Sequence, residues 1–150
     1  MTRPTRRPIR QQYHVRAPPK KVFRALSDPE RITRWLADRA EISPRKGGRF
    51  LLAWEGGPTH TGKLLEFVRG ESITYGWTWP GLEEVGVTRF KIAVEPKGKG
   101  TLVKVTHSGL PMGKKWDDLY AGAIWGWTYF MMNLKSVVEH GHDLRSRHDG

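Results

Sequence analysis

Apolar and polar residues alternate through the middle of the chain. Between residues 39 and 108, apolar side chains recur at every second position, as in Phe50, Leu52 and Trp54, and clusters of glycine and proline separate the runs. Because successive side chains of a strand point to opposite faces, this pattern predicts an antiparallel sheet with one apolar face. The strands are predicted at residues 9–15, 40–43, 48–54, 59–68, 72–79, 85–95 and 101–108.

Two short helices are predicted directly after the first strand. Val22, Phe23 and Leu26 have the spacing that buries one face of a helix. In the segment that follows, Asp28 can cap a second helix, and Pro29 suits its first position. The chain therefore passes from a strand to a tandem pair of helices before the remaining strands begin.

The closing segment, residues 116–141, is predicted to form a long helix that covers the apolar face of the sheet. Steps of 100° per residue from Trp127 place a continuous apolar stripe along this helix. A helix of this length extends about 39 Å at about 1.5 Å per residue, which is enough to cross a sheet. The stripe consists of Trp127 with Trp116, Tyr120, Ala123, Met131, Leu134 and Val138.

Several phrases carry a resemblance to a known family through their order and spacing. They are VFRALSDPERITRWL, GGRFLLAW, GKLLEF, ITYGWTW, GTLVKVTHSGLP and GWTYFMMNLK. Together they resemble the START-like superfamily, also called SRPBCC, and within it the homologues of the activator of heat-shock protein 90 ATPase. The resemblance implies an α+β helix-grip fold, in which a curved antiparallel sheet surrounds a long C-terminal helix and leaves a cavity between them.

The resemblance covers roughly residues 15–139 and implies one domain. We place this START-like domain at residues 9–141. Residues 1–8 are expected to be a flexible basic arm, and residues 142–150 a polar tail.

Composition narrows the possible functions. The 150 residues include no cysteine, which excludes disulfides, thiolate metal ligands and cysteine nucleophiles. The formal net charge is +11, but basic residues are concentrated before the first acid, Asp28. No aromatic residue lies among the arginines of the arm to stack on bases, which argues against a nucleic-acid partner. No apolar run is long enough to span a membrane, so we expect a cytoplasmic protein.

The inward-facing aromatic residues are the main candidates for a function. Such a set can fill a core, or it can line an apolar pocket that has a few polar groups. Gly122 and Gly126 favour a pocket, because each costs about 1 kcal/mol relative to alanine within a helix. We predict a site for a small hydrophobic or aromatic ligand. Its residues would be Trp54, Tyr75, Trp77, Phe90, His107, Tyr120, Trp127 and Met131.

Within this set, three tryptophans (Trp54, Trp77 and Trp127) would form the walls, while His107 and Tyr120 would orient the ligand. No catalytic residue is predicted, because no carboxylate shares the inward row of His107. No cofactor is predicted, and no metal site either, because the spacing of histidines and acids in residues 140–143 is loose. Two alternatives remain open. One is a co-chaperone or stress-response interaction protein of the heat-shock protein 90 ATPase activator type, and the other is a cyclase-like or hydrolase-like enzyme that uses the same cavity.

A second aromatic stripe is predicted on the outer side of the closing helix. Trp125, Tyr129 and Met132 lie about 140° to 160° from Trp127 at 100° per residue, so they point away from the sheet. A large exposed aromatic patch usually marks a contact with a partner. We interpret these three residues as a homodimer interface.

Overall fold

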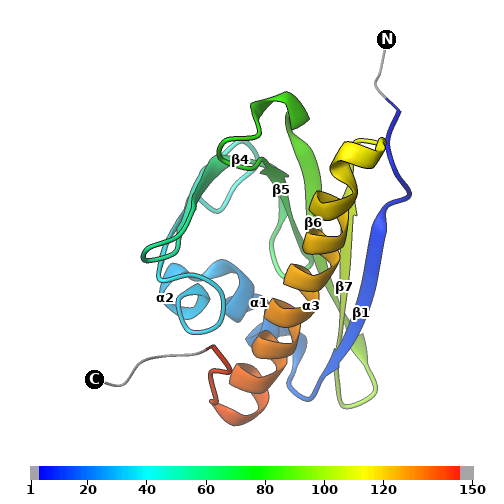
Figure 1. The fold of residues 1–150 in the computed structure, drawn as a ribbon. Coiled ribbons are helices and arrows are strands. Elements are labelled where there is room, and N and C mark those ends of the chain that lie inside the picture. Colours follow the sequence, from blue (N-terminus) through cyan, green and yellow to red (C-terminus); the bar gives the residue numbers. More distant parts are fainter. Residues whose placement is uncertain (1–3, 146–150) are drawn as a thin grey trace.

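The alternating pattern produces a single antiparallel sheet in the computed structural model, which describes residues 4–145. The seven strands lie in the order β1-β7-β6-β5-β4-β3-β2, and the sheet curls around the long helix α3 (Figure 1). The strands are β1 (Ile9–Val15), β2 (Arg39–Ile42), β3 (Arg49–Ala53), β4 (Thr59–Val68), β5 (Ser72–Trp77), β6 (Thr88–Lys97) and β7 (Gly100–Ser108). The helices are α1 (Pro19–Ser27), α2 (Pro29–Ile32) and α3 (Asp117–His140), with 3-10 turns η1 (Glu83–Val85) and η2 (Lys114–Trp116).

This arrangement confirms the predicted helix-grip fold. Strand β6 shows the expected alternation, since Phe90 and Ile92 are buried in the core while Arg89 and Lys91 are exposed. The two short helices close one end of the sheet, as Figure 1 shows. Helix α1 buries Val22, Phe23 and Leu26 as expected. A carboxylate oxygen of Asp28 accepts a hydrogen bond from the backbone N–H of Glu30 and so caps α2.

The connection between β5 and β6 is longer than predicted. Strand β5 ends at Trp77 rather than at residue 79, and β6 begins at Thr88 rather than at residue 85. Pro80 has no N–H to donate to a ladder, and Gly81 and Gly86 have φ angles of 83° and 76°, which a strand does not accommodate. Trp79 therefore leaves the sheet and joins the loop that borders the cavity described below.

Both ends of the described chain are attached to the domain. In the arm, the backbone N–H of Arg6 donates to the Leu110 carbonyl at 2.8 Å, and its guanidinium contacts Asp117 at 2.5 Å. Residues 1–3 of the predicted arm and residues 146–150 of the predicted tail lie outside the described residues. At the other end, Arg145 donates to the carbonyl of Thr33 at 2.8 Å, so the first part of the tail packs near α2. Across residues 4–145, α3 and the other helices lack the length and hydropathy needed for a membrane span.

Candidate ligand-binding cavity

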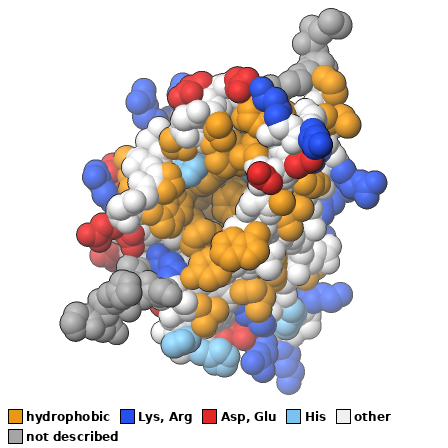
Figure 2. Space-filling view, viewed as in Figure 1, with side chains coloured by type: hydrophobic (Ala, Val, Ile, Leu, Met, Phe, Trp, Pro, Cys, Tyr) orange, Lys and Arg blue, Asp and Glu red, His pale blue; other side chains and the backbone are white. Residues whose placement is uncertain are grey.

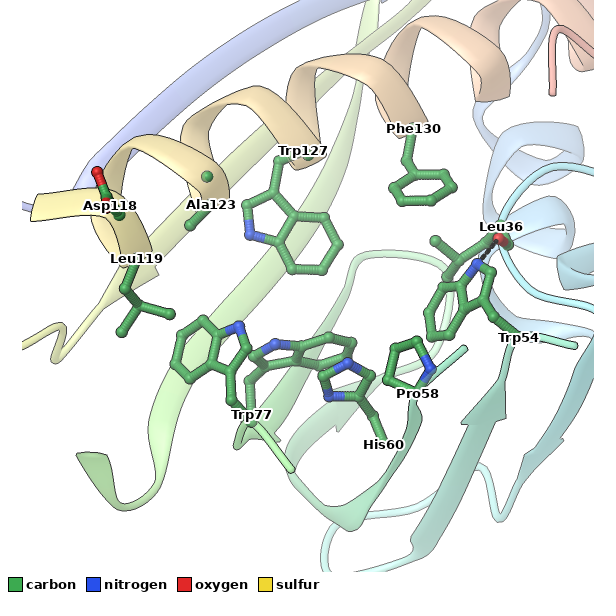
Figure 3. Close-up of a pocket in the computed structure, with 13 residues that line it drawn as sticks. Leu36, Trp54, Pro58, His60, Trp77, Asp118, Leu119, Ala123, Trp127 and Phe130 are labelled. Atoms are coloured by element: carbon green, nitrogen blue, oxygen red, sulfur yellow. Dashed lines mark hydrogen bonds between the residues drawn. The ribbon is translucent and has the colours of Figure 1, made fainter. Parts of the chain in front are cut away.

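A cavity of about 470 Å³ lies between the first half of α3 and the sheet. In Figure 2 it is visible as a hollow with predominantly hydrophobic walls. Figure 3 shows that side chains from α3 form one wall and that side chains from the sheet form the other. The lining residues are Leu36, Trp54, Pro58, His60, Trp77, Trp79, Asp118, Leu119, Gly122, Ala123, Gly126, Trp127 and Phe130.

The helix wall owes its shape to helical periodicity and to two glycines. Residues spaced three or four apart share one face of a helix, so Leu119, Gly122, Gly126 and Phe130 face the cavity together. A Cβ atom placed on Gly122 or Gly126 would meet no atom within 4 Å apart from near neighbours on the same helix. The glycines therefore do not admit a close-packed element; they leave open space in the cavity wall, and Trp127 and Phe130 flank that space.

The sheet wall is built from stacked rings. The imidazole of His60 lies on the indole of Trp77, with 4.3 Å between ring centroids and 21° between their planes. Trp54 meets His60 edge to face at 5.7 Å. The indole N–H of Trp54 donates to the carbonyl of Leu36 at 2.8 Å, which joins the β3 end of the wall to the loop after α2. These contacts hold the rings of the sheet wall in fixed orientations.

His60 contributes a polar group to this apolar wall. Its Nδ1 lies 2.8 Å from the carbonyl oxygen of Thr78, and 7% of the residue is exposed. Burial lowers the pKa of His60 below the usual 6.5, and the hydrogen bond to Thr78 opposes this change. Asp118, the other ionisable residue of the cavity, projects from α3 on the opposite side (Figure 3). No group of three potential metal ligands occurs within residues 4–145.

The predicted orienting residue His107 lies in the packed core and does not line the cavity. Trp127 Nε1 donates to His107 Nδ1 at 3.0 Å, and His107 Nε2 lies 2.7 Å from the hydroxyl of Thr88. That hydroxyl donates to the carbonyl of Trp77, so its oxygen is free to accept from the Nε2–H of His107. Burial lowers the pKa of His107 to about 4. Both ring nitrogens of His107 are therefore used in hydrogen bonds within the core.

The other predicted ligand-binding residues fall into two groups, those that line the cavity and those that do not. Trp54, Trp77 and Trp127 line the cavity. Tyr75, Phe90 and Met131 are buried in the core but do not reach the cavity, because the sheet and α3 pack directly on each other there. The Phe90 and Trp127 rings, for example, stack with centroids 3.6 Å apart.

Tyr120 also differs from its predicted place. Its hydroxyl donates to the carbonyl of Arg7 at 2.9 Å, and the guanidinium of Arg6 lies 5.0 Å from the centre of its ring. The N-terminal segment thus contacts Tyr120. The angle of 100° per residue places Tyr120 on the predicted stripe, but it does not show that residues 6 and 7 contact its ring and hydroxyl.

Comparison with known proteins places this chain in a family. Residues 16–139 match the family model described as Activator of Hsp90 ATPase homolog 1-like protein. The chain belongs to this family. An AHSA1-like protein from Rhizobium etli is 30% identical with a TM-score of 0.72, and the match covers 100% of this chain and 99% of that one. No protein of curated function matches the sequence.

Two further solved structures show the same fold at lower identity. A protein from Mesorhizobium loti is 22% identical with a TM-score of 0.79, over 91% of this chain and 99% of that one. The Aha1 dimer from Colwellia psychrerythraea is 20% identical with a TM-score of 0.79, over 91% of this chain and 98% of that one. At this level of identity the likeness concerns the fold.

Several cavity residues of this family member were not among the predicted ones. His60 pairs with Leu52 in the β3–β4 register, so it shares the inward face of that strand. The short turn after Trp54 was the sequence feature that could have indicated the pairing of His60 with Leu52. Phe130 lies three residues beyond Trp127 on α3, at the edge of the predicted stripe. Leu36 lies in the turn after α2, where strand alternation gives no guide. Trp79 shares the parity of Trp77, but it lies in the loop after β5 and was not named as a ligand contact.

The predicted outward patch, Trp125, Tyr129 and Met132, does lie away from the sheet. Trp125 is 71% exposed and Met132 is 44% exposed, while Tyr129 is partly buried. The rings of Trp125 and Tyr129 stack in parallel at 5.7 Å. Tyr129 in turn contacts Phe130 at 5.2 Å, so the patch is continuous with the cavity wall.

Proposed function

We propose that this protein binds a small hydrophobic or aromatic molecule in the cavity between the sheet and α3. The main support is the open space beside Gly122 and Gly126, which face rings on the opposite wall and have no neighbouring element to accommodate. A volume of about 470 Å³ lies within the range of roughly 300–1,000 Å³ that small-molecule sites occupy. Aromatic walls bind such ligands by stacking and dispersion.

Native mass spectrometry of the protein as purified from cells tests this proposal. A co-purifying small molecule would give the ligand class directly. Titration of the unliganded protein with a panel of aromatic molecules and lipids, followed by tryptophan fluorescence, then gives affinities. Trp77→Leu is expected to weaken binding, whereas Trp125→Leu, at the exposed patch, is the matched control. A protein that carries no molecule and binds none of the panel would overturn the proposal.

A second candidate is an interaction protein of the co-chaperone type. It is favoured by the family description and by the exposed ring of Trp125, which stacks on the partly buried Tyr129. Its test is the ATPase rate of an Hsp90 with wild-type protein and with the double variant Trp125→Ser/Tyr129→Ser. Stimulation by wild type that the double variant loses would support this candidate over the first. A cyclase-like or hydrolase-like enzyme has less support, because the lining carboxylate Asp118 and the imidazole of His60 lie on opposite walls.

The exposed patch also supports our proposal that the protein forms a homodimer through α3. Exposed Trp125 and Met132, with the partly buried Tyr129 that stacks on Trp125, give a second copy an apolar surface of the kind that partners bury. Light scattering of wild type is expected to give twice the mass of the chain, and the variant Trp125→Ser/Tyr129→Ser is expected to give the mass of a monomer. A monomer in both samples would exclude this interface.

A further inference from the structure

The core contains two buried histidines that differ in what their ring nitrogens contact. His107 uses both nitrogens within the protein, with Trp127 and with Thr88. His60 uses only Nδ1, which faces the carbonyl of Thr78. A carbonyl oxygen can only accept a hydrogen bond, so Nδ1 of His60 must carry the proton. In the neutral ring, Nε2 then has a lone pair and acts as an acceptor.

The Nε2 atom of His60 has no hydrogen-bond partner among residues 4–145. Within that part of the chain, the side-chain atoms that are both buried and without a partner belong to Arg31 and Thr74. Because Nε2 of His60 lacks a partner and is not one of these atoms, it is accessible. The space that His60 borders is the cavity. Trp77 stacks on one side of its ring and Trp54 meets it edge to face, so the direction of the lone pair is fixed.

The charges of the lining restrict the partner of this lone pair. No lysine or arginine lines the cavity within the described chain, and Asp118 contributes a carboxylate. An anionic headgroup would therefore find no cation and would meet both a lone pair and a negative charge. A neutral group that donates a hydrogen bond satisfies His60, and the flat rings around it favour an aromatic carrier. Burial lowers the pKa of His60, which keeps the ring neutral at neutral pH.

We propose that the cavity selects neutral aromatic molecules that carry a phenolic hydroxyl, and that this hydroxyl donates its hydrogen bond to Nε2 of His60. The proposal rests on the proposed function and adds a chemical class of ligand to it. It assigns His60 as the residue that determines specificity. It also predicts that fatty acids and other anionic amphiphiles are poor ligands, although they match the cavity in hydrophobicity.

Three naphthalene derivatives of similar shape test this proposal on the wild-type protein. They are 2-naphthol, 2-methoxynaphthalene, which cannot donate, and 2-naphthoate, which is anionic. Calorimetric titration at neutral pH is expected to show that 2-naphthol binds about tenfold more tightly than the methoxy compound, as the loss of one buried hydrogen bond implies. The naphthoate is expected to bind more weakly still. In His60→Phe, which keeps a ring between Trp54 and Trp77, the naphthol and methoxy affinities should become equal.

Equal affinities of wild type for 2-naphthol and 2-methoxynaphthalene would overturn this assignment but would leave the proposed function standing. No binding of either compound, together with no co-purified molecule, would remove both. If His60→Phe does not fold, nitrogen NMR of wild type decides the question. The Nε2 resonance of His60 should be that of an unprotonated nitrogen and should shift with 2-naphthol but not with the methoxy compound. A shift with neither compound would contradict the proposal.

Discussion

The two halves of the sheet–helix interface contain similar residues but are packed differently. In the packed half, Phe90 and Trp127 stack at 3.6 Å, and both nitrogens of His107 are hydrogen-bonded. In the open half, Trp77 and His60 stack on each other, but Gly122 of α3 leaves space above the sheet wall. Aromatic residues on an inward face therefore become core or cavity wall according to what the helix presents to them. The same difference predicts how each half responds to substitution.

The largest expected effect is on stability in the packed half. Phe90 is 2% exposed and stacked, so Phe90→Ala should leave a cavity and lower the free energy of unfolding by about 3–5 kcal/mol. Phe130, in the open half, is only partly buried and already borders empty space. Phe130→Ala should cost about 1–2 kcal/mol, because no new cavity term is added. Urea denaturation of protein refolded without ligand measures both changes.

An equal loss of unfolding free energy in Phe90→Ala and Phe130→Ala would show that α3 packs against the sheet along its whole length. Refolding before the measurement matters, because a bound molecule would add its own stabilisation to the native state and would mask the difference. Phe130→Leu is a matched control that retains most of the apolar area.

The next largest expected effect is a pH dependence of the free energy of unfolding, which arises from His107 in the packed half. The folded-state pKa of His107 is about 4, below the usual 6.5 of the unfolded chain. Between these two values the unfolded state binds a proton that the folded state does not, so stability falls as the pH drops through this window. The full loss, about 3 kcal/mol, is reached below pH 4. Protonation of Nδ1 would also remove the acceptor for the indole N–H of Trp127.

NMR titration of the His107 ring measures its folded-state pKa separately from the carboxylates. Urea denaturation at pH 7 and pH 5 measures the accompanying loss of stability. A His107 ring that titrates near 6.5 would contradict this account, because it would mean that the network with Trp127 and Thr88 does not exclude the protonated ring.

The fold was predictable because its determinants are local. Period-two alternation and glycine-containing turns indicate the strands, and caps such as Asp28 indicate the helices. The boundaries failed where a loop starts with apolar residues, as at Trp79, since alternation continues after hydrogen bonding has ended. Pairing of β1 with β7 joins distant segments, and no local pattern indicates it.

The cavity was less predictable than the fold. Strand parity assigns a residue to a face, and by that criterion Phe90 and Trp77 are equivalent. Whether α3 fills the space above a residue depends on the distance between the helix and the sheet. Strand alternation gives no information about that distance. Gly122 and Gly126 were the sequence signal that indicated the cavity. Glycine destabilises a helix relative to alanine, so two glycines within α3 suggest another role at these positions. His60 gave no such signal, and its importance depends on the one hydrogen bond to Thr78 that leaves Nε2 unused.

The smallest expected effect concerns those two glycines and separates stability from binding. Neither has a positive φ, and a Cβ on either would have open space, so Gly122→Ala and Gly126→Ala should each raise the free energy of unfolding by up to about 1 kcal/mol. Gly141→Ala is the control, since its φ of 70° should make the same change destabilising. Gly126→Leu should fold yet bind 2-naphthol more weakly, because its side chain occupies the ligand space. If the alanine variants gain stability and the leucine variant keeps full affinity, the glycines do not serve a ligand.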